Sequence, residues 1–150
     1  MKKRKKERIY LLKKGEKINE DILRAINELV EVLSPGKGTF DHSRFEELLN
    51  NPMLDMYLLE VEDKIVGMGG LHYVKTLVKE SAWVEAVAIH PDHQRKGLGK
   101  KIMDHIINEA KKKNVNYIEL TTRPARVAAN SFYRKLKFEL RETNVYRLKL

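Results

Sequence analysis

The segment Gln94-Arg95-Lys96-Gly97-Leu98-Gly99-Lys100 has the residue types of an anion-binding turn. It lies between a strand-like apolar run at residues 84–89 and an amphipathic run at residues 98–113. The first turn of a helix has backbone N–H groups without intrahelical acceptors, and the helix dipole adds partial positive charge there. The glycines let the backbone come close to a phosphate, and three basic side chains add full charges. The segment therefore predicts a seat for a diphosphate.

Two common phosphate-binding patterns do not fit this segment. A P-loop needs glycine where Gln94 stands and serine or threonine where Lys101 stands. A dinucleotide fingerprint needs a third glycine where Ile102 stands. The pattern that remains is Gln/Arg-x-x-Gly-x-Gly following a strand, and this narrows the kind of ligand.

The composition is typical of one ordinary globular domain, which we expect to span residues 1–150. The chain has 42% hydrophobic residues and no cysteine, so disulfides, thiolate metal sites and a cysteine nucleophile are excluded. No apolar run approaches the length of a membrane span, and the charged N-terminus lacks the apolar core of a signal peptide. We therefore expect a cytoplasmic protein without a membrane partner.

The net charge of +9 has two interpretations. One is an acidic partner such as nucleic acid or a phosphorylated ligand. The other is a solvated surface rich in lysine and glutamate, which we favour. The run Lys2–Lys6 resembles a basic tail, but no basic patch is interleaved with aromatic residues in the manner that reads bases. We therefore do not expect a nucleic-acid partner.

The first half of the chain predicts a strand, two helices and two further strands. Asn19 can cap the first helix, and Asp41 or Ser43 can cap the second. Glu62-Asp63-Lys64 is a tight hairpin turn between the two later strands. The expected strands and helices are residues 8–12, 18–33, 43–49, 56–61 and 65–71.

The second half predicts alternating strands and helices: strand 84–89, helix 98–113, strand 117–121, helix 124–136 and closing strands 138–140 and 145–150. Strands joined by short connections pair antiparallel, whereas the strand-helix-strand unit gives a parallel pair. We therefore expect an α/β (α+β) fold: a mixed, mostly antiparallel sheet of about seven strands with helices on both faces.

Two blocks of this sequence resemble the GNAT superfamily of N-acetyltransferases. The first is residues 91–99, which look like the family's exit from its fourth strand. The second is Arg123 to Phe138, where an alanine-rich helix ends in Phe132-Tyr133. Lys137 departs from the family's usual glycine before Phe138, which leaves the helix exit open. The two blocks and the element order together cover nearly the whole chain.

The resemblance implies acetyl-CoA as co-substrate, with no metal. It assigns the diphosphate of acetyl-CoA to Gln94–Lys100, and the pantetheine arm to the backbone of Val87, Ala88 and Ile89, on a strand that bulges away from its parallel neighbour. On an ideal helix Arg126, Asn130 and Tyr133 share one face, and this face can line the same arm.

The resemblance also implies the catalytic groups. Tyr133 would protonate the leaving thiolate, since a phenol is protonated at neutral pH. Glu85 would be the base for the acceptor amine; the alternative is a strand carboxylate paired with a surface lysine. His72, His90 and His93 are weaker candidates for the base, and His90 with His93 offers a metal pair without an evident third ligand.

The predicted function is direct acetyl transfer to a primary amine of an unidentified small molecule or protein. The alternative is a non-catalytic module that binds acyl-CoA or nucleic acid. We expect the acceptor to lie among residues 34–41, His72 and Tyr73, and Asn144 and Tyr146. Many relatives form dimers, so a homodimer remains open.

Overall fold

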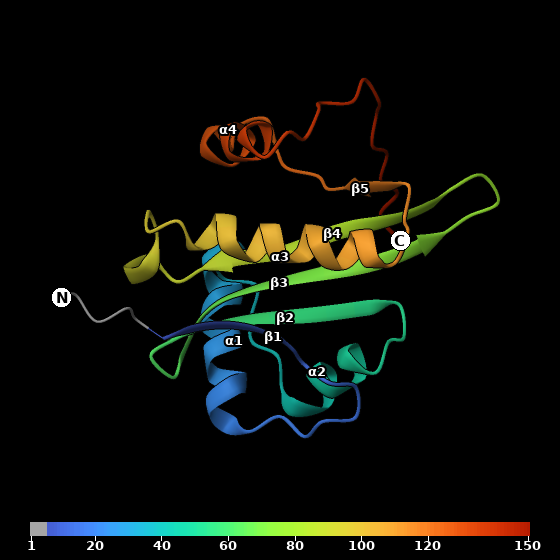
Figure 1. Cartoon of the computed structure of the whole chain (residues 1–150). Coiled ribbons are helices and arrows are strands. Elements are labelled where there is room, and N and C mark those ends of the chain that lie inside the picture. The colour runs from blue at the N-terminus through green and yellow to red at the C-terminus, as the bar shows by residue number, and fades with distance from the viewer. Residues whose placement is uncertain (1–5) are drawn as a thin grey trace. The chain divides into compact units, whose positions relative to one another are not determined.

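The computed structural model describes residues 6–150, so the run Lys2–Lys5 lies outside the described residues. The chain divides into two compact units, one ending at Leu120 and one comprising Thr121–Leu150. The elements in chain order are β1 (Glu7–Leu11), α1 (Glu20–Leu33), α2 (His42–Leu49), β2 (Leu54–Val61), β3 (Lys64–Lys75), β4 (Glu80–Ile89), a 3₁₀ turn (Pro91–His93), α3 (Leu98–Lys112), β5 (Tyr117–Glu119) and α4 (Val127–Lys135) (Figure 1).

The first unit contains one sheet in which the strands lie in chain order, β1-β2-β3-β4-β5. The first four strands pair antiparallel, and β4 pairs parallel with β5. In the sequence, α3 lies between the two parallel strands β4 and β5, as expected for a strand-helix-strand crossover. The prediction of a mixed, mostly antiparallel sheet is therefore confirmed.

The expected seven strands are wrong: within residues 6–150 the sheet has five. Neither 138–140 nor 145–150 forms a strand, although the second segment alternates apolar and polar residues. Its apolar side chains are exposed, Tyr146 by 89% and Leu150 by 108%. Alternation predicts a half-buried strand only where a neighbouring strand and a core are present; here neither covers the segment.

Helices cover both faces of this sheet (Figure 1). The helices α1 and α2 pack on one face, and the caps predicted for them are confirmed: the Asn19 side chain accepts from the Ile22 N–H, and Asp41 accepts from the Arg44 N–H. Twelve buried residues form the core on this side, including Ile26, Phe45 and Leu58. Because strand side chains alternate, neighbouring residues of the same strands face α3.

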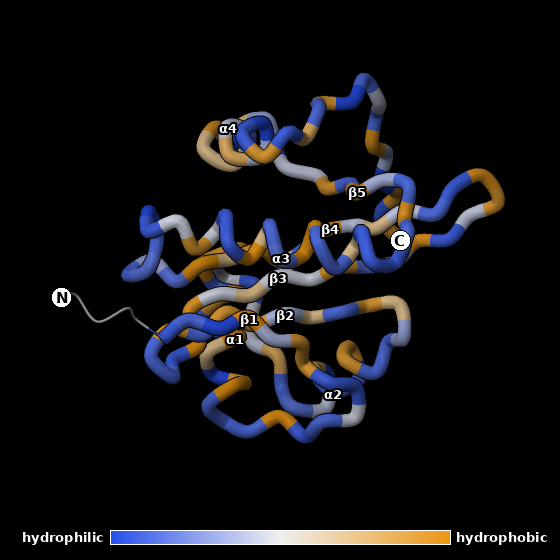
Figure 2. Tube along the Cα trace, in the orientation of Figure 1, coloured by the Kyte–Doolittle hydropathy of each residue, from blue (hydrophilic) through white to orange (hydrophobic). Residues whose placement is uncertain are grey.

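On the other face, α3 turns an apolar stripe toward the sheet, and Figure 2 shows the polar and apolar residues alternating along it. Ile102, Met103 and Ile106 are fully buried. The contact is close because Gly69 of β3 has no side chain: a Cβ there would lie 2.6 Å from Ile106 Cδ1. The missing side chain at Gly69 therefore lets α3 approach β3 closely.

The second unit contains α4 and the segment that follows it. The expected helix 124–136 begins later, at Val127, since Pro124 and Ala125 form a turn. The Arg126 N–H donates to the Arg123 carbonyl (3.0 Å), and the Asn130 Nδ2 donates to the carbonyls of Arg123 and Arg126 (3.0 and 2.9 Å). These bonds satisfy the turn and place the helix boundary after it.

Candidate active site

The strand β4 carries a bulge immediately before the basic loop. Met68 of β3 pairs with Ala88, but Gly70 pairs with Glu85, so Ala86 and Val87 together oppose Gly69. Ala86 has a φ of 51°, which is uncommon for a residue with a side chain. Such bulges bend a strand and interrupt its ladder. The family's bulge in this strand, implied by the resemblance, is therefore present.

The outer edge of β4 is open beyond Trp83 in this sheet. The strand β5 pairs only over Ser81–Trp83, with Tyr117–Glu119 opposite. The His90 N–H donates to the Val66 carbonyl (2.8 Å), so its neighbour Ile89, which pairs with Gly67, directs its backbone groups away from β3. By the same alternation Val87 does so too. The N–H groups of Val87 and Ile89 and the Val87 carbonyl can therefore pair with an extended ligand as a strand would, while the Ile89 carbonyl accepts from the Gln94 side chain.

The basic loop leads from this edge into α3. The Gln94 side chain donates to the Ile89 carbonyl (3.0 Å) and so ties the loop to the strand end. Arg95 and Gly97 both have positive φ, 59° and 78°. Gly97 is the N-cap of α3 and provides no side-chain cap. The N–H groups of the first turn therefore have no side-chain acceptor at this helix N-terminus, as an anion site requires.

The basic side chains of the loop differ in their surroundings. The Lys96 Nζ donates to the Asp92 carbonyl (2.6 Å), and the Lys100 Nζ pairs with Asp104 (2.6 Å). Lys101, which lies beyond the predicted segment, pairs with Glu7. Lys96 and Lys100 must therefore exchange these partners to reach a phosphate, which the sequence could not show.

Glu85 lies on β4 just before the bulge, on the sheet face covered by α1 and α2. Its Oε1 is 2.8 Å from His72 Nε2 of β3. The side chains of His72 and Glu85 are 26% and 38% exposed. The residue that contacts the Glu85 carboxylate at this distance is a histidine, not the surface lysine of the alternative interpretation.

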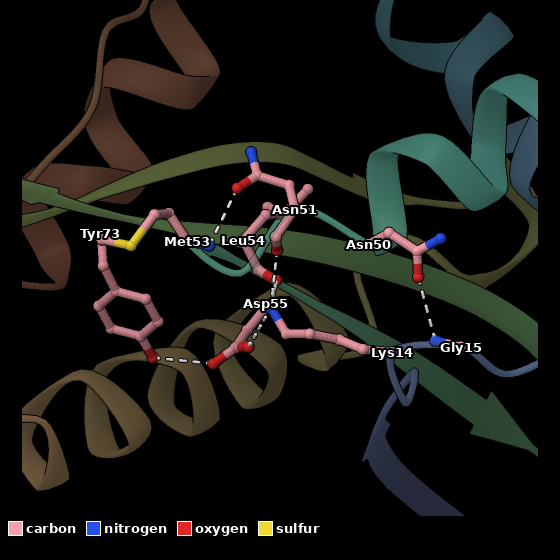
Figure 3. A network of polar contacts seen from close by, with 8 residues as sticks. All are labelled: Lys14, Gly15, Asn50, Asn51, Met53, Leu54, Asp55 and Tyr73. Atoms are coloured by element: carbon pink, nitrogen blue, oxygen red, sulfur yellow. Dashed lines mark hydrogen bonds and ion pairs between the residues drawn. The ribbon is translucent and has the colours of Figure 1, made fainter.

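The neighbouring residues His72 and Tyr73 face opposite sides of β3. The Tyr73 hydroxyl donates to Asp55 Oδ2 (3.0 Å) on the α3 side, where Lys14 contacts the carbonyls of Asn51 and Leu54 (Figure 3). Burial is the main cause that holds the pKa of Tyr73 well above its usual value, and the Asp55 carboxylate raises it further. The Tyr73 side chain therefore lies on the face of the sheet opposite to His72 and fixes the end of β3.

The α1–α2 segment, also expected to border the acceptor, is held by α1. The Asn27 side chain bonds both backbone groups of Phe40 (2.7 and 3.0 Å), and the Glu31 carboxylate accepts from the Gly36 N–H.

The histidines His90 and His93 lie near one another, with ring centroids 6.2 Å apart. Among residues 6–150 no group of three or more His, Asp or Glu is placed to hold a metal ion.

The second unit carries Tyr133 near the end of α4. Its ring packs against Phe132 and Phe138, with centroids 5.4 and 5.9 Å away. Burial raises the pKa of the Tyr133 phenol above its usual value of 10, and the charge of Arg126 partly opposes this shift. The phenol therefore stays protonated across the physiological range.

Two other residues of the predicted helical face, Arg126 and Asn130, differ from the prediction in position or in hydrogen bonding. Arg126 is the N-cap of α4, with a non-helical ψ of 70°, so it does not share a helical face with Tyr133 as predicted. The Asn130 amide already uses its two hydrogens on the backbone of the turn, and only its oxygen can accept from a ligand. A groove of about 620 Å³ in this unit is lined by Asn130, Arg134 and Leu140 among others.

A mixed sheet with a bulged strand, followed by a basic loop at a helix N-terminus, defines the class as an α+β domain. The sequence profile of the Acetyltransferase (GNAT) family matches residues 23–138. The chain belongs to this family, whose members use acetyl-CoA as acyl donor. The resemblance stated from the two sequence blocks is thereby confirmed.

Curated and solved relatives support the assignment. The [ribosomal protein bS18]-alanine N-acetyltransferase of Escherichia coli (strain K12) is 34% identical over 65 residues, 43% of this chain and 44% of that protein. The match therefore spans under half the length of these curated relatives.

Similar solved structures cover most of both chains. A putative acetyltransferase from Agrobacterium tumefaciens str. C58 has a TM-score of 0.82 at 21% identity, covering 95% of this chain and 99% of that one. An aminoglycoside acetyltransferase from an uncultured soil metagenomic sample, in complex with sisomicin, has a TM-score of 0.82 at 20% identity, covering 96% and 95%. These likenesses establish the fold. Among residues 6–150 no helix is long and apolar enough to cross a bilayer.

Proposed function

We propose that this chain transfers the acetyl group of acetyl-CoA directly to a primary amine, as one N-acetyltransferase domain. The observation that carries the proposal is the bulged, open edge of β4. The short basic loop connects this edge to the N-terminus of α3, where Gly97 is the N-cap. The edge suits an extended amide-bearing arm, and the helix end suits a diphosphate. Both features lie within the part of the chain that matches the family profile.

Glu85 and Tyr133 are the proposed proton-transfer groups. Glu85 takes a proton from the acceptor ammonium, and the amine then attacks the thioester carbonyl carbon. A backbone N–H near Val87 stabilises the developing oxyanion. The C–S bond breaks, and Tyr133 gives its proton to the thiolate. A second proton from the amine nitrogen reaches the phenolate through solvent, and Glu85 releases its proton to solvent. The products are an amide and the CoA thiol.

The acceptor is proposed by class only. The curated relative acts on the alanine of a ribosomal protein, and a solved neighbour holds an aminoglycoside. A first panel should therefore contain a peptide with an N-terminal alanine, spermidine and sisomicin. The chain has no cysteine, so a thiol reagent reports released CoA without background from the protein.

The test has two readouts. Isothermal titration should show acetyl-CoA binding with a micromolar Kd, and at least one amine should raise CoA release well above the rate with acetyl-CoA alone, with the acetylated amine found by mass spectrometry. Absence of acetyl-CoA binding at millimolar ligand would overturn the proposal. Binding without transfer to a wide range of amines would favour a non-catalytic acyl-CoA module.

A further inference from the structure

The pairing of His72 with Glu85 follows from the register of three strands. His72 pairs with Leu54 on one side and Trp83 on the other, and Gly70 pairs with Glu85. His72 and Glu85 are therefore diagonal neighbours on one face of the sheet, a separation that two long side chains can bridge. The 2.8 Å contact between them is consequently built into the β3–β4 ladder.

Gly70 provides the space in which the Glu85 side chain lies. A Cβ at position 70 would lie 2.9 Å from Met56 Sδ and 3.1 Å from Glu85 Cγ. The second distance is shorter than ordinary van der Waals contact, so a side chain there would displace the carboxylate. The sheet therefore both leaves room for Glu85 and supplies its partner.

The end of β3 that carries His72 is fixed from the opposite face. The Tyr73 N–H donates to the Met53 carbonyl (2.8 Å), and the Tyr73 hydroxyl donates to Asp55 (Figure 3). Because His72 is adjacent in the strand, these bonds restrict where its imidazole can lie. The restriction reaches Glu85 through the Nε2–Oε1 contact.

We propose that His72 is a positioning residue that holds Glu85 for proton abstraction from the acceptor amine. Nε2 lies 2.8 Å from Oε1, so a proton on Nε2 would engage this oxygen and leave Oε2 to accept the proton of the ammonium. A carboxylate held in one rotamer meets the geometric requirement of a general base more often than a mobile one. This inference rests on the proposed function, in which Glu85 is the base.

The experiment compares four variants in the acceptor assay: His72→Leu, His72→Gln, Glu85→Gln and the control His105→Leu. The control removes a histidine that packs edge-on against Tyr57 on the α3 face, with centroids 5.1 Å apart. His72→Gln retains an N–H donor near the position of Nε2. Each is assayed with the panel amine that the wild type acetylates fastest, and each is checked for folding by circular dichroism.

We expect His72→Leu to lower kcat about 10-fold and Glu85→Gln to lower it about 100-fold or more, since a general base contributes about 10² to 10⁴. The KM for acetyl-CoA should stay within about twofold, and His72→Gln should recover most of the lost kcat, because it restores a donor to Glu85. The control His105→Leu should keep the wild-type kcat.

Each contrary outcome separates the inference from the function on which it rests. An unchanged kcat in His72→Leu, or an equal loss in His72→Gln, overturns the positioning role even when Glu85→Gln is inactive. Full activity in Glu85→Gln overturns Glu85 as base, and with it this inference, while acetyl transfer itself stands.

A spectroscopic measurement on the unliganded protein needs no acceptor. The ¹⁵N shifts of the His72 ring should report a proton on Nε2, with slow exchange in the wild type that is lost in Glu85→Leu. A rapidly exchanging Nε2–H in both proteins would contradict the contact itself.

Discussion

At the scale of single residues, the basic loop holds cations in unlike circumstances. Lys96 and Lys100 already donate to Asp92 and Asp104, and releasing those contacts reduces what either gains from a phosphate. Arg95 sits at a backbone position with positive φ, next to the N-terminus of α3. The sequence identifies the segment, but it does not show which of its basic side chains already have a partner within the protein.

Arg95→Ala should weaken acetyl-CoA binding more than Lys96→Ala does. A charge-assisted hydrogen bond to phosphate contributes about 1.5–3 kcal/mol, so we expect a rise in Kd of about 10-fold or more for Arg95→Ala. Lys96→Ala should raise Kd only a few-fold, because its contact with Asp92 is lost as well. Isothermal titration of both variants at one salt concentration checks the order, and a reversed order would assign the phosphate to Lys96.

Tyr133→Phe should lower kcat about 10- to 100-fold while leaving the acetyl-CoA Kd within about twofold, as expected for an acid that acts on the leaving group. The raised pKa of the phenol sets the sign of the pH effect. The protonated, active form persists above pH 10, so the fall in kcat attributable to Tyr133 should lie above pH 10. Rates of wild type and variant from pH 7 to 10.5 check this; a wild-type decline already complete by pH 9 would remove the role.

At the scale of elements, the end of α4 shows the conformational cost of having Lys137 where the family usually has glycine. Lys137 has a φ of 70°, and the Phe138 N–H donates back to the Tyr133 carbonyl (3.0 Å). This is the left-handed position after a helix that glycine adopts without strain. The departure from the family's glycine, noted in the sequence, is therefore accommodated by holding a lysine in an unfavourable conformation.

Lys137→Gly should stabilise the protein by about 1 kcal/mol, because the left-handed conformation costs a residue with a Cβ about that much. Thermal unfolding should show a rise in Tm of about 2–4 °C. Lys135→Gly is the matched control, since it removes the same charge from the last residue of α4, which has helical backbone, and should lower the stability by up to about 1 kcal/mol. A lower Tm for Lys137→Gly would contradict the assignment of strain.

Most helices and strands of the first unit could be predicted from the sequence. The start of α4 and the structure of the residues that follow it could not. Periodicity and caps predicted α1, α2 and α3 because their apolar stripes match the faces that they bury. The turn that precedes α4 depends on the Asn130 amide bonding two carbonyls, and residue types alone do not show where a side chain will donate. The two expected closing strands fail for a related reason, since a strand needs a partner.

The candidate site could be predicted in part for the same reason. Glycines and cations mark the loop, and their chemistry is local. The partner of Glu85 depends on the register of β3 against β4, which the bulge at Ala86 shifts. A bulge adds one residue to one strand and so changes which side chains meet, and the sequence has no pattern that counts it.

At the scale of the whole molecule, the positive charge is concentrated at the two ends of the chain. Lys2–Lys6 contribute five basic residues, and residues 121–150 contain eight basic and two acidic ones. The residues between them, 7–120, hold 17 basic and 19 acidic side chains. Residues 7–120 therefore fit the favoured interpretation of a surface rich in charges of both signs, and the net charge of +9 comes from the two ends of the sequence.

Replacing the five basic residues at positions 2–6 by glutamine should lower the salt concentration that elutes the protein from heparin, while acetyl-CoA binding stays unchanged. Polyanion binding scales with the number of cations engaged, and the proposed acyl donor site uses residues 87–100. A control in which five exposed lysines elsewhere are replaced, at positions 13, 17, 37, 64 and 75, would test whether position matters. Wild-type elution with impaired acetyl-CoA binding would instead tie the basic run to the donor site.

Gly70 has a consequence for how this sequence can change over time. The space left by its missing methyl group is shared by a core methionine, Met56, and by the carboxylate of Glu85. Selection for tighter packing and selection for proton transfer therefore act on one position in opposite directions. We expect Gly70, His72 and Glu85 to vary together among descendants of this chain, so that an alanine at 70 is found only where the acid at 85 has been replaced as well.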